Sequence, residues 1–359
     1  MPATQAPRRR SKGAKALSLV LAAGFTGALF WYLLRATHWS DWTAMWAGAD
    51  HRHLLAYLFL FATVMLLRAV RYCILLRASE GEAAPGLGDL TLLTFVSNLF
   101  VDLLPARSGS LAYVVFLNQK LDVRLAACFS SFAFSFIFDV IGMLPLLLAA
   151  ILGMRTVPGG GGPWLWAALG VLAAGGLAAL ALIDRLLGAA ARLAMIWTAR
   201  QADPSSRLVR ALARLGEETE RIARDMAQVK AKGVFWPLLL ISMTIRACKY
   251  LSLYLVILGM AGQWGPEATG RLTLGLVLFS LVAAEATASL PISGLAGFGA
   301  YEGVMIFILR QAGLDSTQAA LLPVTLHLLT QTLDYSTGGA ALLWLMGRTK
   351  AAKNGGNGR

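Results

Sequence analysis

The sequence predicts an all-α polytopic membrane protein built as an inverted repeat. Hydrophobic residues make up 57% of the 359-residue chain and charged residues only 14%, whereas soluble proteins carry about 25% charged residues. Several apolar runs approach or exceed the roughly 20 residues that a helix needs to cross a bilayer. Two short stretches, Arg68–Tyr72 and Arg246–Tyr250, are nearly the same, and each is followed by an apolar segment that a proline interrupts. Paired interrupted helices of this kind are typical of transporters made of two repeats.

Six apolar runs are expected to be full spans, which with two broken segments gives about eight hydrophobic helices. Helices are expected because they satisfy their own backbone hydrogen bonds in lipid. Basic residues gather before the first run, after the last, and in the central loop between Arg185 and Lys232. The positive-inside rule therefore places both termini and this loop in the cytoplasm of a bacterial inner membrane protein. The expected spans are residues 17–35, 54–76, 125–153, 164–183, 234–260 and 319–346.

Two further apolar segments are expected to be broken or re-entrant helical hairpins. With the neighbouring spans fixed by loop charge, residues 90–118 must begin and end in the cytoplasm, and residues 270–312 must begin and end outside. The first segment is broken around Pro105 and the second around Pro291. Proline removes a backbone donor, and irregular backbone within a membrane survives only where protein buries it or water reaches it.

The predicted organisation has five parts. Its two membrane repeats have inverted topology, which gives alternating access when one repeat rocks against the other. The parts are a basic cytoplasmic tail (1–16), a first repeat (17–153), an external loop (154–163), a second repeat (164–346) and a basic cytoplasmic tail (347–359).

Residues 204–232 of the central loop are predicted to form a cytoplasmic amphipathic helix. Asp203 and Pro204 supply an N-cap and a first-turn proline. Arginines on the polar face suit binding to the anionic inner leaflet. The apolar spacing fits equally well a helix packed on the protein or on a second copy of the chain. The apolar positions are Leu208, Leu212, Leu215, Thr219, Ile222, Met226 and Val229.

Ionisable side chains inside the expected spans are candidate substrate-binding residues, because each costs at least about 2.5 kcal/mol in lipid unless it is paired or hydrated. Arg246 and Lys249 lie three residues apart near the middle of their span. Arg68 and Arg71 repeat this spacing nearer the cytoplasmic end, where anchoring at the membrane surface is an alternative explanation. Salt bridges within the protein are the alternative role for each acid. The candidate acidic partners are Asp102, Asp139, Glu285, Glu302 and Asp334.

The tips of the two hairpins supply further candidates. Arg107 stands between Pro105 and Gly109, where a helix end also offers free N–H groups, and this combination suits a phosphate or carboxylate headgroup. In the second break, Gly297 and Gly299 permit a turn. The carboxylate of Glu302 opens the next helical segment, where it stabilises the helix N-terminus. A nucleotide loop is not expected there, because no strand precedes the glycines and no Lys-Ser/Thr follows them.

No cofactor or metal site is expected. Cys73, Cys128 and Cys248 show no paired spacing, and His51 and His53 lack further ligands nearby. The net charge of +13 is accounted for by the loops, so no nucleic-acid partner is expected.

At the two breaks the sequence resembles the lysylphosphatidylglycerol synthase transmembrane-region family, a flippase-like membrane domain also found at the N-terminus of multiple peptide resistance factors. That family carries Pro-x-Arg-x-Gly-Glu at the first break and Gly-x-Gly-x-Arg-Glu at the second. The matching residues are Pro105, Arg107 and Gly109, and then Gly297, Gly299 and Glu302. Ser110 replaces the glutamate and Tyr301 the arginine, so the identity of the substrate is not carried over.

The resemblance implies lipid translocation, or a role in envelope-lipid or polyprenyl-linked glycan pathways. The family's synthase activity belongs to a separate soluble domain that this sequence lacks, so aminoacyl transfer is not expected. We expect a flippase-like protein that handles an anionic lipid. The alternatives are a membrane enzyme acting on a lipid-linked sugar or phosphate and a scaffold for envelope-biosynthesis enzymes. Homo-oligomers are also compatible with the sequence.

Overall fold

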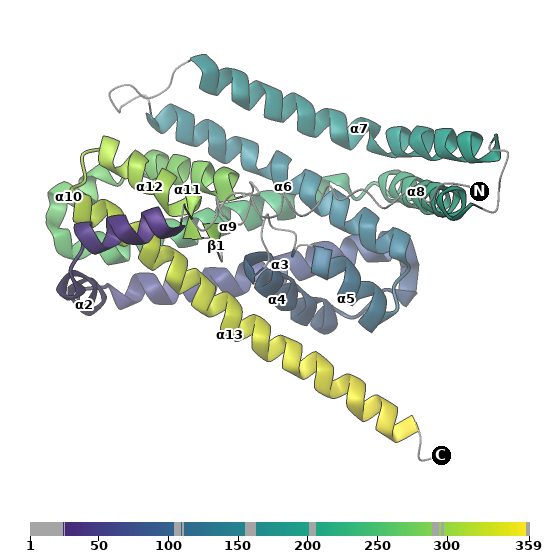
Figure 1. Cartoon of the computed structure of the whole chain (residues 1–359), viewed down its shortest axis with the longest axis horizontal. Coiled ribbons are helices and arrows are strands. Elements are labelled where there is room, and N and C mark those ends of the chain that lie inside the picture. The colour runs from purple at the N-terminus through teal and green to yellow at the C-terminus, as the bar shows by residue number, and fades with distance from the viewer. Residues whose placement is uncertain are drawn as a thin grey trace, which may run out of the picture.

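The computed structural model of the chain is an elongated array of helices (Figure 1). The structure describes residues 24, 26–103, 109, 111–154, 163–200, 206–288, 294–295 and 298–356. Residues 26–36 are helical. The other elements are α2 (Trp39–Ala47), α3 (His51–Glu80), a 3-10 turn (Gly81–Ala83), α4 (Leu87–Leu103), α5 (Leu111–Leu121), α6 (Leu125–Met154), α7 (Pro163–Ala199), α8 (Arg207–Ala231), α9 (Phe235–Ala261), a second 3-10 turn (Gly262–Trp264), α10 (Gly265–Arg271), α11 (Leu274–Ala288), β1 (Gly294–Leu295), β2 (Phe298–Gly299), α12 (Ala300–Gln311) and α13 (Ser316–Gly356).

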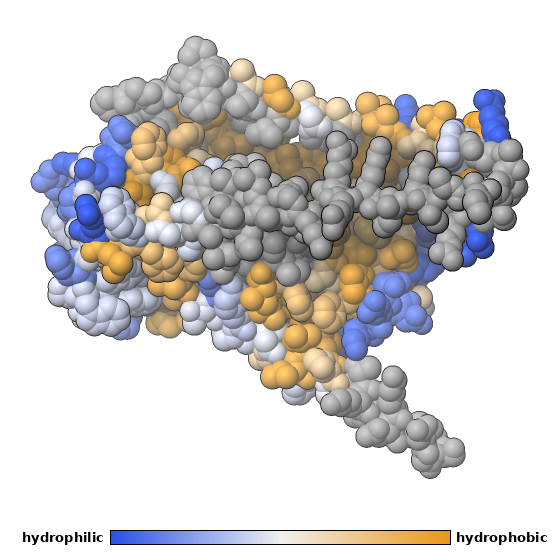
Figure 2. Space-filling model, in the orientation of Figure 1, coloured by the Kyte–Doolittle hydropathy of each residue, from blue (hydrophilic) through white to orange (hydrophobic). Residues whose placement is uncertain are grey.

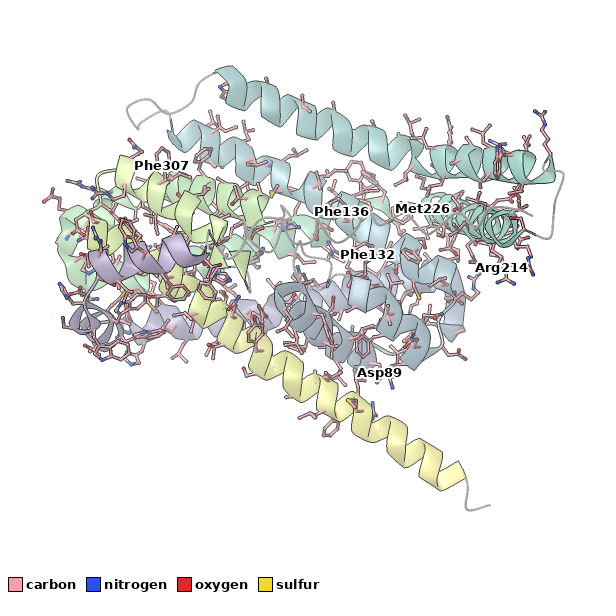
Figure 3. All side chains as sticks on the ribbon, in the orientation of Figure 1. Asp89, Phe132, Phe136, Arg214, Met226 and Phe307 are labelled. Carbon is pink, nitrogen blue, oxygen red and sulfur yellow. The ribbon has the colours of Figure 1, made fainter. Side chains whose placement is uncertain are left out.

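The chain is an all-α membrane protein, as the sequence predicted. Within the described residues, three helical segments are long and apolar enough to cross a membrane: His51–Glu80, Leu125–Leu152 and Phe235–Arg271. The long helices α7 and α13, with 37 and 41 residues, cover two more of the expected spans. Large apolar side chains such as Phe136 and Phe307 are 64% and 63% exposed on the outside of the helices (Figure 3). Figure 2 shows the same apolar surface over the central part of the molecule, with hydrophilic side chains toward both ends.

The first hairpin consists of α4 and α5 and opens at the end of the molecule that carries α8, here called the α8 end. Arg124, directly before α6, donates through Nε to Glu80 Oε1 at the end of α3, over 2.7 Å. Since α4 follows α3 and α5 precedes α6, both open ends of the hairpin lie beside this ion pair. At the turn, a Cβ on Gly109 would overlap the carbonyl oxygen of Phe100 in α4, so only glycine fits there. Pro105 and Arg107 lie outside the described residues.

The second hairpin, α11 and α12, opens at the opposite end of the molecule, here called the α10 end (Figure 1). Arg271, before α11, donates to the carbonyl oxygen of Gly313, after α12. At its tip, β1 and β2 pair antiparallel, with Gly294 opposite Gly299. Pro291 and Gly297 lie outside the described residues. The two hairpins therefore open at opposite ends, as the count of crossings predicted.

The helices that carry the repeated sequence, α3 and α9, pack against each other in the centre of the molecule. Val64 and Met65 of α3 are buried in one cluster with Ile245 of α9. On α6, Gly142 allows a close approach to α9, because a Cβ there would lie 3.1 Å from the backbone of Ser242. Three helices thus meet at the level of the two repeated basic pairs.

The predicted amphipathic helix is α8, and its apolar face packs on the protein. Met226 and Val229 are buried in a cluster with Leu75 of α3 and Phe134 of α6, whereas Arg214 lies on the outer side of α8 (Figure 3). Asp225 is 3% exposed and accepts hydrogen bonds from hydroxyl groups of α3 and α6. These contacts hold α8 against the membrane helices and leave its basic face outward.

Candidate functional site

One carboxylate lies between two guanidinium groups where α3, α6 and α9 meet. Arg71 Nη1 is 2.5 Å from Asp139 Oδ1, and Arg246 Nη2 is 3.0 Å from Asp139 Oδ2. Arg71 also donates to Ser242 Oγ over 2.9 Å and is only 1% exposed. Asp139 can neutralise only one of the two arginines, so this group of three side chains carries one excess positive charge.

Arg68, the other arginine of the α3 basic pair, bonds to the first hairpin. Arg68 Nη1 donates to Asn98 Oδ1 on α4 over 2.7 Å, and Asn98 Nδ2 donates to Asp334 Oδ1 on α13 over 2.8 Å. A neutral amide therefore separates Arg68 from the carboxylate of Asp334. This chain of contacts joins α3, α4 and α13.

Lys249 of α9 bonds to the second hairpin. Lys249 Nζ is bonded to Glu285 Oε1 on α11, and the hydroxyl of Tyr250 donates to Glu285 Oε2 over 3.2 Å. The side chains of Lys249 and Glu285 are 26% and 12% exposed. Among the described side chains, Asn98 of the first hairpin thus bonds to the basic pair of α3, and Glu285 of the second hairpin bonds to the basic pair of α9.

We call these residues the central charge cluster: Arg68, Arg71, Arg246 and Lys249 with Asp139, Glu285 and Asp334. These seven described side chains are four cations and three carboxylates, so their charges sum to one positive charge; the side chains of Asp102 and Arg107 lie outside the described residues. Within the described part of the chain, the buried Nε–H groups of Arg68, Arg71 and Arg246 have no hydrogen-bond partner. Leaving buried donors unsatisfied, and a charge uncompensated, is unfavourable in a protein interior and in lipid. The arrangement is suited to an anion that supplies oxygen acceptors.

Glu302, predicted from sequence as a substrate-binding residue, has other partners. Its carboxylate is fully buried, accepts from the backbone N–H of Gly299 over 2.7 Å and is bonded to His327 Nδ1. Gly299 has a φ of 140°, a conformation that glycine tolerates. Of the other sequence candidates, Asp102 lies in α4 but its side chain falls outside the described residues, as do Pro105, Arg107, Pro291 and Gly297.

Sequence reasoning did not identify Asn98, Ser242, Tyr250 or His327 as site residues. Tyr250 ends the second copy of the repeated stretch, and that repetition was the available signal. Asn98 and Ser242 are uncharged, so they were not among the ionisable residues predicted to bind substrate within the spans. His327 lies in an apolar run, and no charged residue within six positions of it marks it as a candidate.

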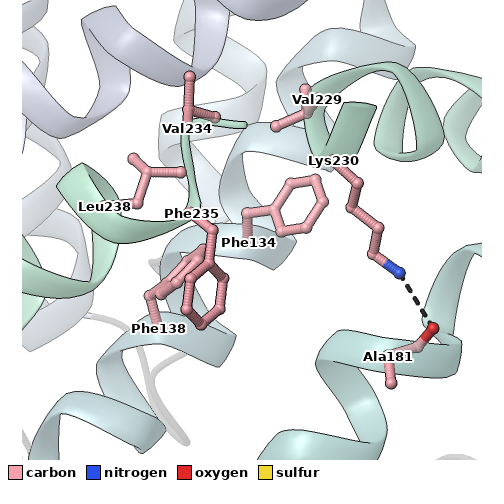
Figure 4. A pocket seen from close by; sticks show the side chains of 8 residues that line it. All are labelled: Phe134, Phe138, Ala181, Val229, Lys230, Val234, Phe235 and Leu238. Atoms are coloured by element: carbon pink, nitrogen blue, oxygen red, sulfur yellow. Dashed lines mark hydrogen bonds between the residues drawn. The ribbon is translucent and has the colours of Figure 1, made fainter. Parts of the chain in front are cut away.

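A cavity of about 280 Å³ lies between α6, α7, α8 and α9 (Figure 4). On α6, Phe138 lines the cavity and directly precedes Asp139; on α9, Leu238 lines it one turn before Ser242. Its walls are apolar apart from Lys230. The lining residues are Phe134, Phe138, Ala181, Val229, Lys230, Val234, Phe235 and Leu238.

Lys230 gives this cavity a charged edge near the α8 end. Its Nζ donates to the carbonyl oxygen of Ala181 over 3.2 Å (Figure 4) and forms an ion pair with Asp184 of α7. Burial alone would raise the pKa of Asp184, but the hydrogen bond and the charge of Lys230 outweigh it and lower this pKa. The ionised form of Asp184 is therefore favoured, and the apolar cavity has an ion pair at its edge.

A family model described as the lysylphosphatidylglycerol synthase TM region matches residues 16–335. The match includes α2 to α12 and the part of α13 that carries His327 and Asp334. Neither the curated proteins nor the solved structures contain a match to the chain.

Proposed function

Since this chain belongs to the lysylphosphatidylglycerol synthase transmembrane-region family, we propose that it binds the headgroup of an anionic lipid at the central charge cluster and moves that lipid between leaflets. The observation that carries the proposal is the sharing of Asp139 by Arg71 and Arg246. A phosphate would supply the missing negative charge and accept from the unsatisfied guanidinium donors. Arginine is well suited to this, because its donors match the geometry of phosphate oxygens.

The apolar cavity supports a lipid over a small soluble anion. A lipid needs an apolar environment as well as a site for its charged headgroup, and the phenylalanine-lined cavity is bounded by α6 and α9, the helices that carry Asp139 and Arg246. Its volume of about 280 Å³ is too small for a whole lipid and holds only part of one chain. The rest of the chain would lie against the exposed apolar surface of the helices.

The arrangement of the hairpins supports movement between leaflets. The α4–α5 hairpin opens at the α8 end and contributes Asn98, whereas the α11–α12 hairpin opens at the α10 end and contributes Glu285. A headgroup at the cluster would touch both hairpins. A shift of one hairpin would open a path to one end of the molecule, which is alternating access around a fixed site.

The proposed setting is a bacterial inner membrane, with the α8 end and both termini in the cytoplasm. The basic outer face of α8, with Arg210, Arg214, Arg221 and Arg224 exposed, would then lie near the anionic inner leaflet. Juxtamembrane basic residues are each worth about 1 kcal/mol at such a surface. The proposed role is transport or binding, without chemical conversion of the lipid.

The test is lipid translocation in proteoliposomes made from anionic and zwitterionic phospholipids and followed by leaflet-selective labelling. We expect the wild type to move an anionic lipid and Arg246→Ala to lose this activity while remaining folded, because Arg71 still neutralises Asp139 in that variant. Arg348→Ala, which removes an exposed ion pair with Asp89, is the matched control and should retain activity. Full activity of folded Arg246→Ala would overturn the proposed role of the cluster.

A further inference from the structure

At the tip of the second hairpin, a buried carboxylate and an imidazole form a pair outside the central charge cluster. Glu302 is 0% exposed and lies in the first turn of α12, and His327 of α13 has a side chain that is 14% exposed. The His327 ring is stacked against Phe298, with centroids 4.4 Å apart, and lies 5.3 Å from the ring of Tyr301. Aromatic rings and backbone therefore enclose a group that can gain or lose a proton.

The hydrogen bonds around His327 define which protons are present. Both Glu302 oxygens accept, one from the Gly299 N–H and one from His327 Nδ1, so Glu302 is a carboxylate. Gln331 Nε2 is 2.8 Å from His327 Nε2; because an amide nitrogen only donates, we assign Nε2 as the acceptor and the imidazole as neutral in this arrangement. The pair then carries one negative charge in an apolar interior, and its hydrogen-bond partners among the described residues are neutral donors at the N-terminus of α12 and on α13.

A second proton state is available with little rearrangement. If Nε2 of His327 takes up a proton from water, the Gln331 amide can rotate and accept from it through its oxygen. The pair then becomes an ion pair with no net charge, and the bond between α12 and α13 becomes charge-assisted. A single proton thus strengthens the attachment of the second hairpin tip to α13.

Within the described residues, the charged groups on the elements that adjoin this pair have partners of their own. Thr287 of α11 donates to the carbonyl oxygen of Ala300, which places the Glu285 turn beside the first turn of α12, and Glu285 is bonded to Lys249 and Tyr250. Arg310 donates to the carbonyl oxygen of Leu314 at the far end of α12. Further titratable groups on the described parts of the adjoining elements are Tyr301, Asp334, Tyr335 and Arg348, with Tyr32 and Arg35 on residues 26–36.

We propose that Glu302 and His327 form a proton-binding site that couples the movement of the second hairpin to proton uptake. This inference rests on the proposed function, because it names the ion that would drive lipid movement. The site is linked to the hairpin through Gly299 at the tip, whose N–H the carboxylate holds, and to the closing helix through His327. Histidine is suited to this role because its protonation changes between about pH 5 and pH 8.

The first experiment measures lipid translocation by the full chain in proteoliposomes with and without an imposed pH gradient. The wild type should respond to the gradient, and His327→Gln and Glu302→Gln should lose the response while still moving lipid when no gradient is present. His51→Gln, an exposed histidine at the start of α3, is the matched control and should respond as the wild type does. A gradient response retained by both folded variants at the pair would overturn the inference.

A second experiment separates failure of this inference from failure of the proposed function. Infrared difference spectra of the full chain in detergent, recorded between about pH 5 and pH 8, report carboxyl and imidazole bands without any need for transport. We expect bands that vanish in both Glu302→Gln and His327→Gln. If these bands occur and no lipid moves, the proton site stands and the proposed function fails; if no band depends on either residue, the proton site is wrong.

Discussion

Arg71 on α3 and Lys249 on α9 occupy matching positions in the repeated sequence, yet their described ion pairs differ, because Lys249 pairs with Glu285 and Arg71 shares Asp139 with a second arginine. Glu285 is bonded to Lys249 and to the hydroxyl of Tyr250. Asp139 is shared by Arg71 and by Arg246 from the other repeat. The second repeat therefore closes one ion pair locally, whereas within the described residues the two arginines around Asp139 bond to one carboxylate between them.

This difference separates a structural ion pair from a binding site. The repeat positions the basic residues in both halves, but acidic partners on the neighbouring helices decide which charge remains available. On α4, the residue that bonds to Arg68 is the neutral amide of Asn98. On α11, the corresponding helix of the second hairpin, the residue that bonds to Lys249 is the carboxylate of Glu285. Among the described side chains, the first hairpin thus places an amide next to Arg68, whereas the second hairpin places a carboxylate next to Lys249.

The largest effect is expected when the shared carboxylate is neutralised. Asp139→Asn leaves Arg71 and Arg246 buried without a counter-charge, and breaking a buried pair in this way costs about 3–5 kcal/mol. Asp89→Asn removes an exposed ion pair with Arg348 and should cost about 1 kcal/mol or less. Thermal unfolding of both variants in detergent would check this, and equal melting temperatures would show that Asp139 is not the shared partner.

The second-largest effect is expected from double substitutions, which should distinguish the Lys249–Glu285 pair from the arginines that share Asp139. Lys249→Met combined with Glu285→Gln removes both charges of a local pair, and such replacements are often neutral or stabilising. Arg71→Met combined with Asp139→Asn still leaves Arg246 without its carboxylate. We expect the first double variant to unfold near the wild-type temperature and the second well below it. Equal losses in the two double variants would contradict the distinction between a closed pair and a shared one.

A smaller effect is expected from a matched pair of glycine substitutions in the two hairpins. Gly109→Ala forces a Cβ into the carbonyl oxygen of Phe100, and overpacking of this kind costs about 1–3 kcal/mol. Gly303→Ala has open space around its Cβ in an exposed turn of α12 and should gain up to about 1 kcal/mol from helix propensity. Unfolding temperatures that move in opposite directions would confirm the tight turn of the first hairpin. A neutral Gly109→Ala would contradict it.

Much of the fold could be predicted from hydrophobicity and loop charge. Long apolar runs and the positions of arginines fixed the helices and the opposite openings of the hairpins, and the spacing over residues 204–232 identified α8 to within a few residues. These patterns are local, or follow from counting crossings. The sequence left open whether α8 packs on the protein, and burial of Met226 and Asp225 now shows that it does.

The partners of the buried charges could not be predicted. Arg71 is separated by 68 residues from Asp139, and Asn98 by 236 from Asp334. Such pairs depend on how helices pack in space, and a single sequence carries no local signal for them. His327 was missed for the same reason, because its partner Glu302 lies on a different helix.

The most direct test of the central claim is binding of anionic and zwitterionic phospholipids to the purified full chain by native mass spectrometry. The account expects the wild type to retain one anionic lipid in preference to a zwitterionic one, and Arg246→Ala to lose this preference while Arg348→Ala keeps it. An unchanged preference in Arg246→Ala would contradict the claim that the charge beside Asp139 holds the headgroup.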